Sequence, residues 1–283
     1  MASFFNQATL IYRGQITNSN VTTGEIVDVL GATKTAISQN YGANDAIAYT
    51  VSLVNSGASA LENISITDNL GAYTLGTVTV YPLEYVDGTL KYFLNGILQP
   101  TPTVTAAPEL TVSGINIPAG ANALLIYEAR TNEYAPLEAG SVISNGVTAS
   151  SDGLCGPLEA TASIPVREEA LPFITKFSSA SQLVCNGEIT YTFVIQNLGN
   201  TSTVATDDLV LRDTFNPILN ISSVKLDGVE WSEGANYTYD AASGEFATLP
   251  GQITLPAASY ETDSTGLVST TPGVVILTVT GTV

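Results

Sequence analysis

The chain of 283 residues is 45% hydrophobic and 12% charged, which is sufficient for two domains with ordinary cores and unlike a disordered tail. Its net charge of −18, with only eight Lys and Arg residues, argues against nucleic acid or an anionic membrane as a partner, because both require a basic face. The chain lacks His and has two Cys and one Met, so it offers no His-based relay, no catalytic triad and too few soft metal ligands. We therefore expect no enzyme activity, no cofactor, no metal site and no insertion into a membrane.

The first predicted element is a hairpin within residues 1–27. Residues 6–14 and 16–27 alternate apolar and polar side chains on either side of a turn, which indicates two paired strands. Its apolar side chains could anchor the hairpin in a groove, and the first three of them are predicted to share one face: Ala8, Leu10, Tyr12, Ile16, Val21 and Ile26.

Two sets of body strands follow, over residues 28–133 and 167–283. The pattern Tyr-Thr-x-x-x-x-Asn-x-Gly occurs at residues 49–57 and again at 191–199, each time at the same distance from an earlier Lys, Lys34 or Lys176. Each body then has an alternating strand that ends in an Asp, Asp68 or Asp213. Runs rich in Val, Ile, Thr and Tyr, with Gly and Pro between them, predict an all-β fold of two tandem repeats.

Tight hairpins are predicted at one place in each body. Asn95-Gly96 in the first body and Asp227-Gly228 in the second lie between apolar runs. These dipeptides favour the two-residue turns that join neighbouring antiparallel strands.

Only the first body is followed by a closing hairpin, at residues 134–166. Its strand Asn145-Gly-Val-Thr-Ala149 is similar to Asn6-Gln-Ala-Thr-Leu10 of the first hairpin, and no such segment follows the second body. The expected domains are thus a donor hairpin over 1–27, a sandwich over 28–166 and an incomplete sandwich over 167–283. The hairpin of one subunit would complete the second domain of the next, or, alternatively, fold back onto the second domain of its own chain.

The repeated strand pattern, the early Thr-Lys, the strand end at Asp68 and the closing strand at Asn145 together resemble the bacterial repeat family catalogued as domain of unknown function eleven. The resemblance covers nearly the whole chain and implies immunoglobulin-like β-sandwiches of cell-surface and spore-surface proteins. A two-repeat chain without an export signal looks most like the structural subunits of spore appendages in anaerobic spore-forming Firmicutes. It implies a filament on the spore surface, built from protein made in the mother-cell cytoplasm, with the cell surface as the alternative.

The predicted function is a structural subunit that assembles head to tail by donor-strand complementation. A sandwich that lacks strands exposes core side chains and unpaired backbone groups, which soluble proteins avoid. A joint of this kind is heterologous and open, so it generates a fibre. The expected partners are further copies of the chain, with an anchoring surface protein as a further candidate. The alternatives are a monomeric, adhesin-like tandem binding module and a surface-layer component.

The two cysteines are expected to lie where the two domains meet. Cys155 falls in the turn of the closing hairpin and Cys185 in an early loop of the second body. An intrachain disulfide between them would close a loop of about 30 residues and stiffen the connection between the domains. Two free thiols and a lateral bridge between chains are the alternatives.

Two sets of residues suggest covalent cross-links of the type formed in Gram-positive surface sandwiches. The first set is Lys34 and Asn145 near Asp68, and its intermolecular copy is Lys176 and Asn6 of the next subunit near Asp213. In this chemistry a buried Lys amine condenses with an Asn amide, aided by a carboxylic acid that burial keeps protonated. The alternative is a Lys that reaches solvent along its apolar stem, with Asn and Asp serving turns. No motif in the sequence distinguishes the two.

Overall fold

The computed structural model describes residues 2–283, so Met1, the first residue of the predicted hairpin, lies outside the description. Within these residues the only helical element is the short 3-10 turn Ala205–Asp207, and the all-β prediction is confirmed. No helix of the described chain is long and apolar enough to cross a membrane. The chain divides into two compact units: unit 1 is Met1–Ala135 with Val142–Pro165, and unit 2 is Pro136–Ser141 with Val166–Val283.

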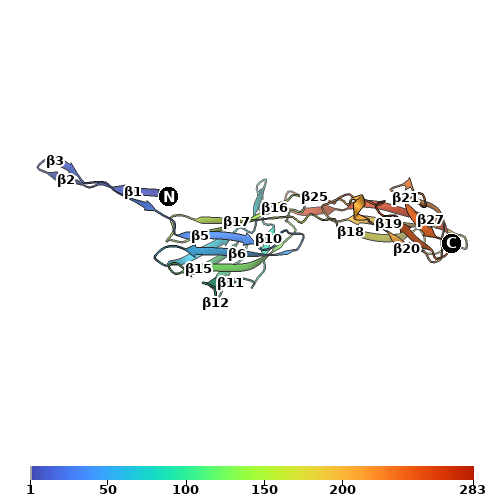
Figure 1. The fold of residues 1–283 in the computed structure, drawn as a ribbon, viewed down its shortest axis with the longest axis horizontal. Coiled ribbons are helices and arrows are strands. Elements are labelled where there is room, and N and C mark those ends of the chain that lie inside the picture. Colours follow the sequence, from blue (N-terminus) through green and yellow to red (C-terminus); the bar gives the residue numbers. More distant parts are fainter. Residues whose placement is uncertain (1) are drawn as a thin grey trace. The chain divides into compact units, whose positions relative to one another are not determined.

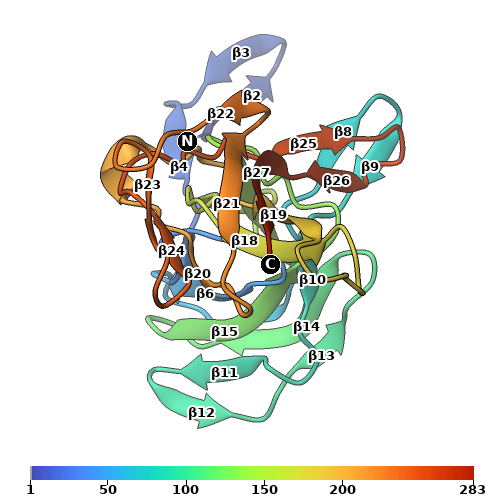
Figure 2. The ribbon, with the colours of Figure 1, turned by 90° about the vertical axis from the view of Figure 1, so that its right-hand side faces the viewer.

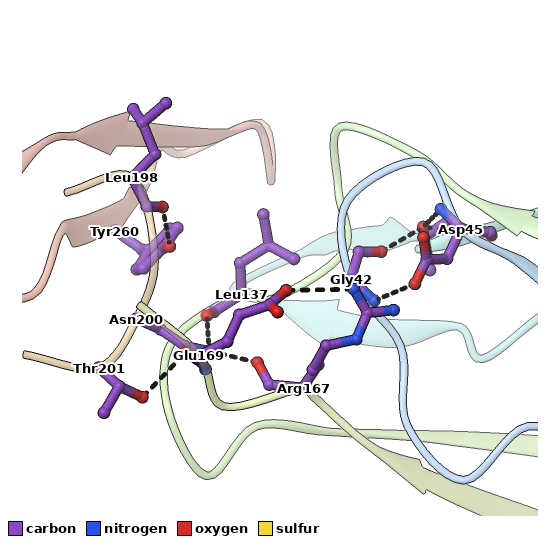
Figure 3. A network of polar contacts seen from close by, with 10 residues as sticks. Gly42, Asp45, Leu137, Arg167, Glu169, Leu198, Asn200, Thr201 and Tyr260 are labelled. Carbon is purple, nitrogen blue, oxygen red and sulfur yellow. Dashed lines mark hydrogen bonds and ion pairs between the residues drawn. The ribbon is translucent and has the colours of Figure 1, made fainter. Parts of the chain in front are cut away.

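The segment Pro136–Ser141 belongs to unit 2, although the sequence places it in the closing hairpin of the first domain. Asn200 holds it there, because its Nδ2 donates hydrogen bonds to the carbonyl oxygens of Leu137 at 3.0 Å and Arg167 at 2.9 Å (Figure 3). The backbone N–H of Glu169 donates to Asn200 Oδ1 at 3.0 Å. The partly buried amide of Asn200 thus joins two segments that the sequence pattern assigns to different domains.

The N-terminal hairpin is present and is made of two short ladders. Strand β1 (Ala2–Asn6) pairs with β4 (Thr22–Ile26), and β2 (Thr9–Tyr12) pairs with β3 (Gln15–Asn18). Its turn is Arg13-Gly14, with φ of 49° and 83°, the left-handed conformations that a two-residue hairpin turn needs. These four strands pair only with one another among the strands of residues 2–283 (Figure 1).

Unit 1 is a complete sandwich of two antiparallel sheets. The first sheet has the order β12-β11-β15-β6-β5 with β10 also paired to β15, and the second has the order β13-β14-β7-β16-β17. A separate hairpin joins β8 (Tyr73–Leu75) to β9 (Val78–Val80). The strands of the two sheets are β5 (Leu30–Ala36), β6 (Ala46–Asn55), β7 (Leu61–Asp68), β10 (Leu83–Tyr85), β11 (Lys91–Leu94), β12 (Ile97–Gln99), β13 (Thr103–Thr105), β14 (Leu110–Ile117), β15 (Asn122–Thr131), β16 (Val142–Ser150) and β17 (Leu158–Pro165).

Alternating side chains of both sheets form the core of unit 1. In β6 every second residue is buried, among them Tyr49, Val51 and Leu53, and in β7 Ile64 and Ile66 are buried. This period of two is what a strand with one face on a core requires. The closing strands β16 and β17 complete the second sheet, and β17 lies against β5 of the first (Figure 1).

Unit 2 repeats the first sheet but has a smaller second sheet. Its five-stranded sheet has the order β18-β19-β27-β21-β22, its three-stranded sheet the order β20-β24-β23, and β25 pairs with β26. The strands are β18 (Pro172–Ser178), β19 (Glu188–Asn197), β20 (Arg212–Thr214), β21 (Asn220–Leu226), β22 (Val229–Glu230), β23 (Tyr237–Asp240), β24 (Glu245–Thr248), β25 (Ser259–Thr262), β26 (Val268–Thr271) and β27 (Gly273–Thr282).

Both predicted tight hairpins are confirmed. Asn95-Gly96 joins β11 to β12, and β11 lies between β12 and β15 (Figure 2). Asp227-Gly228 joins β21 to β22. All four turn residues have positive φ, as this turn type demands.

The Asn of the repeated strand pattern has a structural role in each unit. Asn55 and Asn197 are fully buried. Asn55 Nδ2 donates to the carbonyl oxygens of Ser59 at 2.8 Å and Ile117 at 3.0 Å, and Asn197 Nδ2 donates to those of Thr201 at 2.7 Å and Pro256 at 3.0 Å. The repeated Asn therefore fixes loops at the same end of both sandwiches.

Candidate functional site

Unit 2 has an unpaired strand edge where unit 1 has its closing hairpin. In unit 1, β7 lies between β14 and β16, and Val147 of β16 pairs with Asp68. In unit 2 the equivalent strand is β20, which contains Asp213 and pairs with β24 alone. Within residues 2–283 no strand of unit 2 takes the place of β16 or β17. Such an edge offers free N–H and C=O groups for pairing with a further strand.

An apolar groove runs beside this edge. It has a volume of about 130 Å³ and lies between β18 and residues 209–211, the segment that leads into β20. The equivalent space in unit 1, between β5 and β7, is filled by the closing hairpin. The side chains that line the groove are those of Pro172, Phe173, Ile174, Ile195, Leu209, Val210, Leu211 and Ile253.

The strand β18 exposes large apolar side chains. Phe173 and Phe177 are each 56% exposed. At the equivalent positions β5 has the smaller residues Gly31 and Thr35, as the shared strand register shows. Both phenylalanines lie on the face of β18 opposite to Lys176, as Gly31 and Thr35 lie on the exposed face of β5. An exposed apolar patch of this kind marks an interaction surface.

The N-terminal hairpin matches the closing hairpin of unit 1 in register. When Asn6 is placed where Asn145 lies, Phe4 takes the position of the buried Ile143 and Gly24 that of Ile164. In the hairpin the ring of Phe4 covers Gly24, so that a Cβ at this position would clash with it. One aromatic ring therefore occupies the room that two isoleucine side chains fill in unit 1.

The six predicted anchors are all exposed in the hairpin, but they do not all point the same way. Ile16 pairs directly with Ile11, whereas Leu10 pairs with Thr17 and Tyr12 with Gln15. Paired residues share a face, so Ile16 lies on the face opposite to Leu10 and Tyr12. The two-residue turn fixes this pairing, so the shared face predicted for Leu10 and Tyr12 does not include Ile16.

Ile26, by contrast, lies on the same face as Phe4, since its partner is Ala2. Ala8 and Leu10 are each an even number of residues from Phe4, so the strand period of two assigns them to the face of Phe4. Val21 lies in the break between the two ladders. Phe4 and Phe5 are exposed residues that the sequence prediction missed, because it began the first strand at Asn6. The strand propensity of two adjacent Phe residues directly before Asn6 could have revealed them.

A buried polar cluster lies at the equivalent place in unit 1. Lys34 Nζ is 2.6 Å from Asp68 Oδ2, and the two side chains are 0% and 1% exposed. The hydroxyl of Tyr127 donates to the same oxygen, and the backbone N–H of Leu70 donates to Asp68 Oδ1 at 2.9 Å. The prediction that Lys34 could reach solvent along its stem is therefore wrong, because β16 and β17 cover it.

Asn145 of β16 belongs to this cluster. It is fully buried, and its Oδ1 accepts a hydrogen bond from the backbone N–H of Gly71 at 3.1 Å. Its Nδ2 makes no well-formed hydrogen bond within residues 2–283, although the amide lies close enough to Asp68 to influence the carboxyl group. A buried amide nitrogen without a partner is costly, so its presence here needs a reason.

Burial shifts both charged groups of the cluster toward their neutral forms. It lowers the pKa of the Lys34 amine to about 8, against the attraction of Asp68. It raises the pKa of the Asp68 carboxyl, against the opposing effects of Lys34, the Leu70 N–H and Asn145. A neutral amine, a protonated acid and an amide at one buried place are the components of an amide exchange between Lys34 and Asn145.

Unit 2 contains the same ion pair without the third component. Lys176 Nζ contacts Asp213 Oδ2, but the side chains are 38% and 18% exposed. Lys176 also lies over the ring of Tyr191 at 4.4 Å, as Lys34 lies over that of Tyr49. The position of Asn145 belongs to the strand that unit 2 lacks within the described chain. In the sequence match between residues 6–10 and 145–149, the N-terminal hairpin has Asn6 at the position of Asn145.

Cys155 and Cys185 are both free, exposed thiols in the structure. They belong to different units. The prediction that both lie where the units are connected is wrong: β17 separates Cys155 from the connection at Val166, and β18 separates Cys185 from it. The reason is strand direction, since each loop follows a strand that runs away from the connection.

No family model matches the chain, and no curated protein matches it. Among solved structures, a major pilin subunit of Bacillus cereus shares 10% identity over 95% of this chain and 73% of the pilin, with a TM-score of 0.38. A fragment of a major pilin of Streptococcus agalactiae shares 13% identity over 86% of both chains, with a TM-score of 0.36.

The collagen-binding subdomain of an Enterococcus faecalis surface protein shares 8% identity over 50% of this chain and 99% of that subdomain, with a TM-score of 0.33. At such identities and scores, these likenesses do not by themselves indicate a function.

Proposed function

We propose that the chain is a non-catalytic structural subunit of an extracellular filament, in which the N-terminal hairpin of each subunit completes unit 2 of its neighbour. The observation that carries this proposal is internal to the molecule. Unit 1 has a closing hairpin over its β5 and β7, unit 2 has an open groove at the same place, and the unpartnered hairpin has the register of the closing one. The spore surface is the proposed location.

Burial of the inward face of the hairpin provides the driving force. Phe4, Ala8, Leu10 and Ile26 would leave water, and each large apolar side chain contributes about 1.5–3 kcal/mol when fully buried. Ile174 of the acceptor, which lies on the same face of β18 as Lys176 and lines the groove, would be covered at the same time. Because the hairpin is already paired in the free chain, less conformational entropy is lost on binding than for a disordered segment.

Backbone pairing adds to this and sets the register. In unit 1 the ladder between β16 and β7 begins at the pair Val147 and Asp68 and ends at the pair Ser150 and Ser65. The donated strand would form the same ladder with β20 and the residues before it, with Ala8 beside Asp213. Main-chain pairing of this kind gives affinity, and the pockets for alternate side chains give specificity.

Covalent closure is the second part of the proposal. The neutral Lys34 amine attacks the amide carbon of Asn145, the bond between that carbon and Nδ2 breaks, and ammonia leaves. Asp68 donates a proton to the amide and takes one from the amine, so that it returns to its starting state. The same reaction joins Lys176 to Asn6 of the donated hairpin once that hairpin buries Lys176 and Asp213.

Deletion of residues 1–27 tests the proposal. The full chain should form fibres in negative-stain microscopy, whereas the deletion variant should fold and form none, because it has a groove but no hairpin. Ordered fibres of the full-length type from the deletion variant would show that the hairpin is not the joint. A full-length chain that stays monomeric would favour the binding module, and sheets would favour the surface layer.

A further inference from the structure

The two thiols lie at defined ends of their units. Cys155 is in the exposed loop between β16 and β17, and Ser151 Oγ of this loop donates to the carbonyl oxygen of Glu62 at 2.9 Å. Loss of solvent and a hydrogen bond to Asp28 raise the pKa of the Cys155 thiol. The hydrogen bond places Cys155 beside Asp28, where the hairpin joins unit 1. Cys155 is thus at the end of unit 1 from which the hairpin extends.

Cys185 is in the exposed loop between β18 and β19. The backbone N–H of Val283 donates to the carbonyl oxygen of Gly187 in this loop at 3.3 Å. Lys176 and Asp213 are near the same end, because Lys176 is two residues before the end of β18. The opposite end of unit 2 is where the chain enters, at Pro172 beside Asn197.

The direction of the closing hairpin in unit 1 sets the direction of a donated hairpin. Strand β16 begins beside the end of β17, where Val142 pairs with Pro165, and runs past Asp68 toward Ser65. The closing hairpin therefore enters and leaves at the end of unit 1 that carries the Lys34–Asp68 pair. Seated in unit 2 with this direction, a donated hairpin enters and leaves at the Lys176–Asp213 end.

That end is the one that carries Cys185. Residues 26 and 27 of the donor would leave the groove there, and Asp28, next to Cys155, would follow directly. We infer that Cys155 of the donating subunit and Cys185 of the accepting subunit form a disulfide at each head-to-tail joint. This inference rests on the proposed donation of the hairpin.

Exposed apolar side chains flank both thiols at this place. Val184, next to Cys185, is 78% exposed, and Leu183 is also exposed. On the donor, Ile26 and Val27 are exposed beside Asp28. A joint would cover these side chains together, so burial of apolar area would bring the two loops into contact before any bond forms.

The bond needs an oxidant. Two thiols lose two protons and two electrons, the electrons pass to dioxygen or to a small-molecule disulfide, and one S–S bond forms. Both loops are exposed, so an oxidant can reach each thiol in the free subunit and at a fibre end. The bond would hold the loops of successive subunits together in addition to the strand ladder.

Single Cys→Ser variants provide a sharp test because the proposed bond joins unlike residues. Fibres are grown from the full chain, oxidised in air, blocked with iodoacetamide and run on gels without reductant. The Lys176→Arg change keeps the positive charge beside Asp213 but removes the amine that could condense with Asn6, and it is included in all chains so that only disulfides contribute to a ladder. We expect a ladder of oligomers that collapses to monomer with reductant.

Cys155→Ser alone and Cys185→Ser alone should each give monomers, whereas fibres grown from a mixture of the two should give dimers and nothing larger. Dimers from either single variant alone would overturn the inference in favour of a lateral bridge. A monomer from the parent chain that runs faster without reductant would overturn it in favour of an intrachain bond. Fibres with thiols that stay free under air would refute the disulfide and leave the donated hairpin intact, whereas loss of fibres altogether would refute the hairpin joint.

Discussion

The pairs Lys34–Asp68 and Lys176–Asp213 show how much the covering strands decide at the residue scale. Both pairs occupy equivalent strands and both lysines lie over a Tyr ring. Only the first is removed from water, and there the pKa of the amine falls to about 8. An ion pair that is buried with its partners incompletely bonded is costly, whereas an exposed one contributes little. The chemistry of the two sites therefore differs until a strand covers the second.

Intact-mass measurement tests the proposed bond in unit 1. The isolated subunit should be lighter than its sequence by one ammonia, because condensation of Lys34 with Asn145 releases Nδ2. Asn145→Ala should restore the sequence mass, and Lys34→Ala should do the same. Lys176→Ala is the matched control, since its site lacks the Asn in the free chain, and it should keep the deficit. A wild-type subunit of full sequence mass would contradict the bond.

At the scale of elements, the N-terminal hairpin is similar to the closing hairpin of unit 1 and pairs with no sandwich strand of residues 2–283. Asn6 pairs with Thr22 where Asn145 pairs with Ala162, so the path around the turn is one residue shorter in the N-terminal hairpin. Phe4 lies on the same face of β1 as Asn6, which would face the core of unit 2, whereas Phe5 lies on the opposite face. This alternation provides a control within one strand.

Phe4→Asp should abolish fibre formation, because it places an uncompensated charge in the core of unit 2. Phe5→Asp, on the outward face, should leave fibres of normal appearance. Both side chains are exposed in the free subunit, so neither change should lower its melting temperature by more than a few degrees. Equal effects of the two changes on fibre formation would show that the hairpin is not seated in the register proposed here.

A synthetic peptide provides the same test without fibres. A peptide of residues 3–27 should raise the melting temperature of the chain that lacks residues 1–27, since a ligand that binds only the folded state stabilises it. The same peptide with Phe4→Asp should have no effect. A shift of equal size with both peptides would indicate binding elsewhere.

For the whole molecule, the proposed assembly has one donor and one acceptor in each chain, which would give the fibre a polarity. A donated hairpin would enter unit 2 of the next subunit, so the two ends of the fibre would differ. Heterologous contacts of this kind continue until a subunit lacks one of the two parts. The chain without residues 1–27 has the groove and lacks the hairpin.

This truncated chain should therefore cap growing fibres. Added at a small molar fraction to full-length subunits, it should shorten fibres as its fraction rises, because it accepts a hairpin and offers none. A chain that is truncated and also carries Ile174→Asp, at a groove residue that is 48% exposed, is the control, and it should leave fibre length unchanged. Fibre lengths from electron microscopy provide the measurement, and lengths that do not depend on the truncated chain would contradict a polar joint.

Much of this could be predicted from the sequence, because strand periodicity, turn dipeptides and the repeated Lys, Tyr, Asp and Asn positions are local signals. They identified two tandem repeats, the turns at Gly96 and Gly228, and the match between Asn6 and Asn145. They could not assign Ile16 to a face, since the pairing across the turn decides it. They also could not place Pro136–Ser141, which the partly buried amide of Asn200 holds to unit 2.

The sequence by itself thus determined an all-β fold with two tandem repeats and two hairpins of similar sequence, at residues 1–27 and 134–166. The tertiary structure decided which Lys is buried, since Lys34 and Lys176 have similar local sequences and differ only in the strands that cover them. It also decided where the thiols lie, because the end of a sandwich that a loop occupies depends on strand direction. Burial and direction are properties of packed sheets, and they are therefore absent from the local pattern of residues.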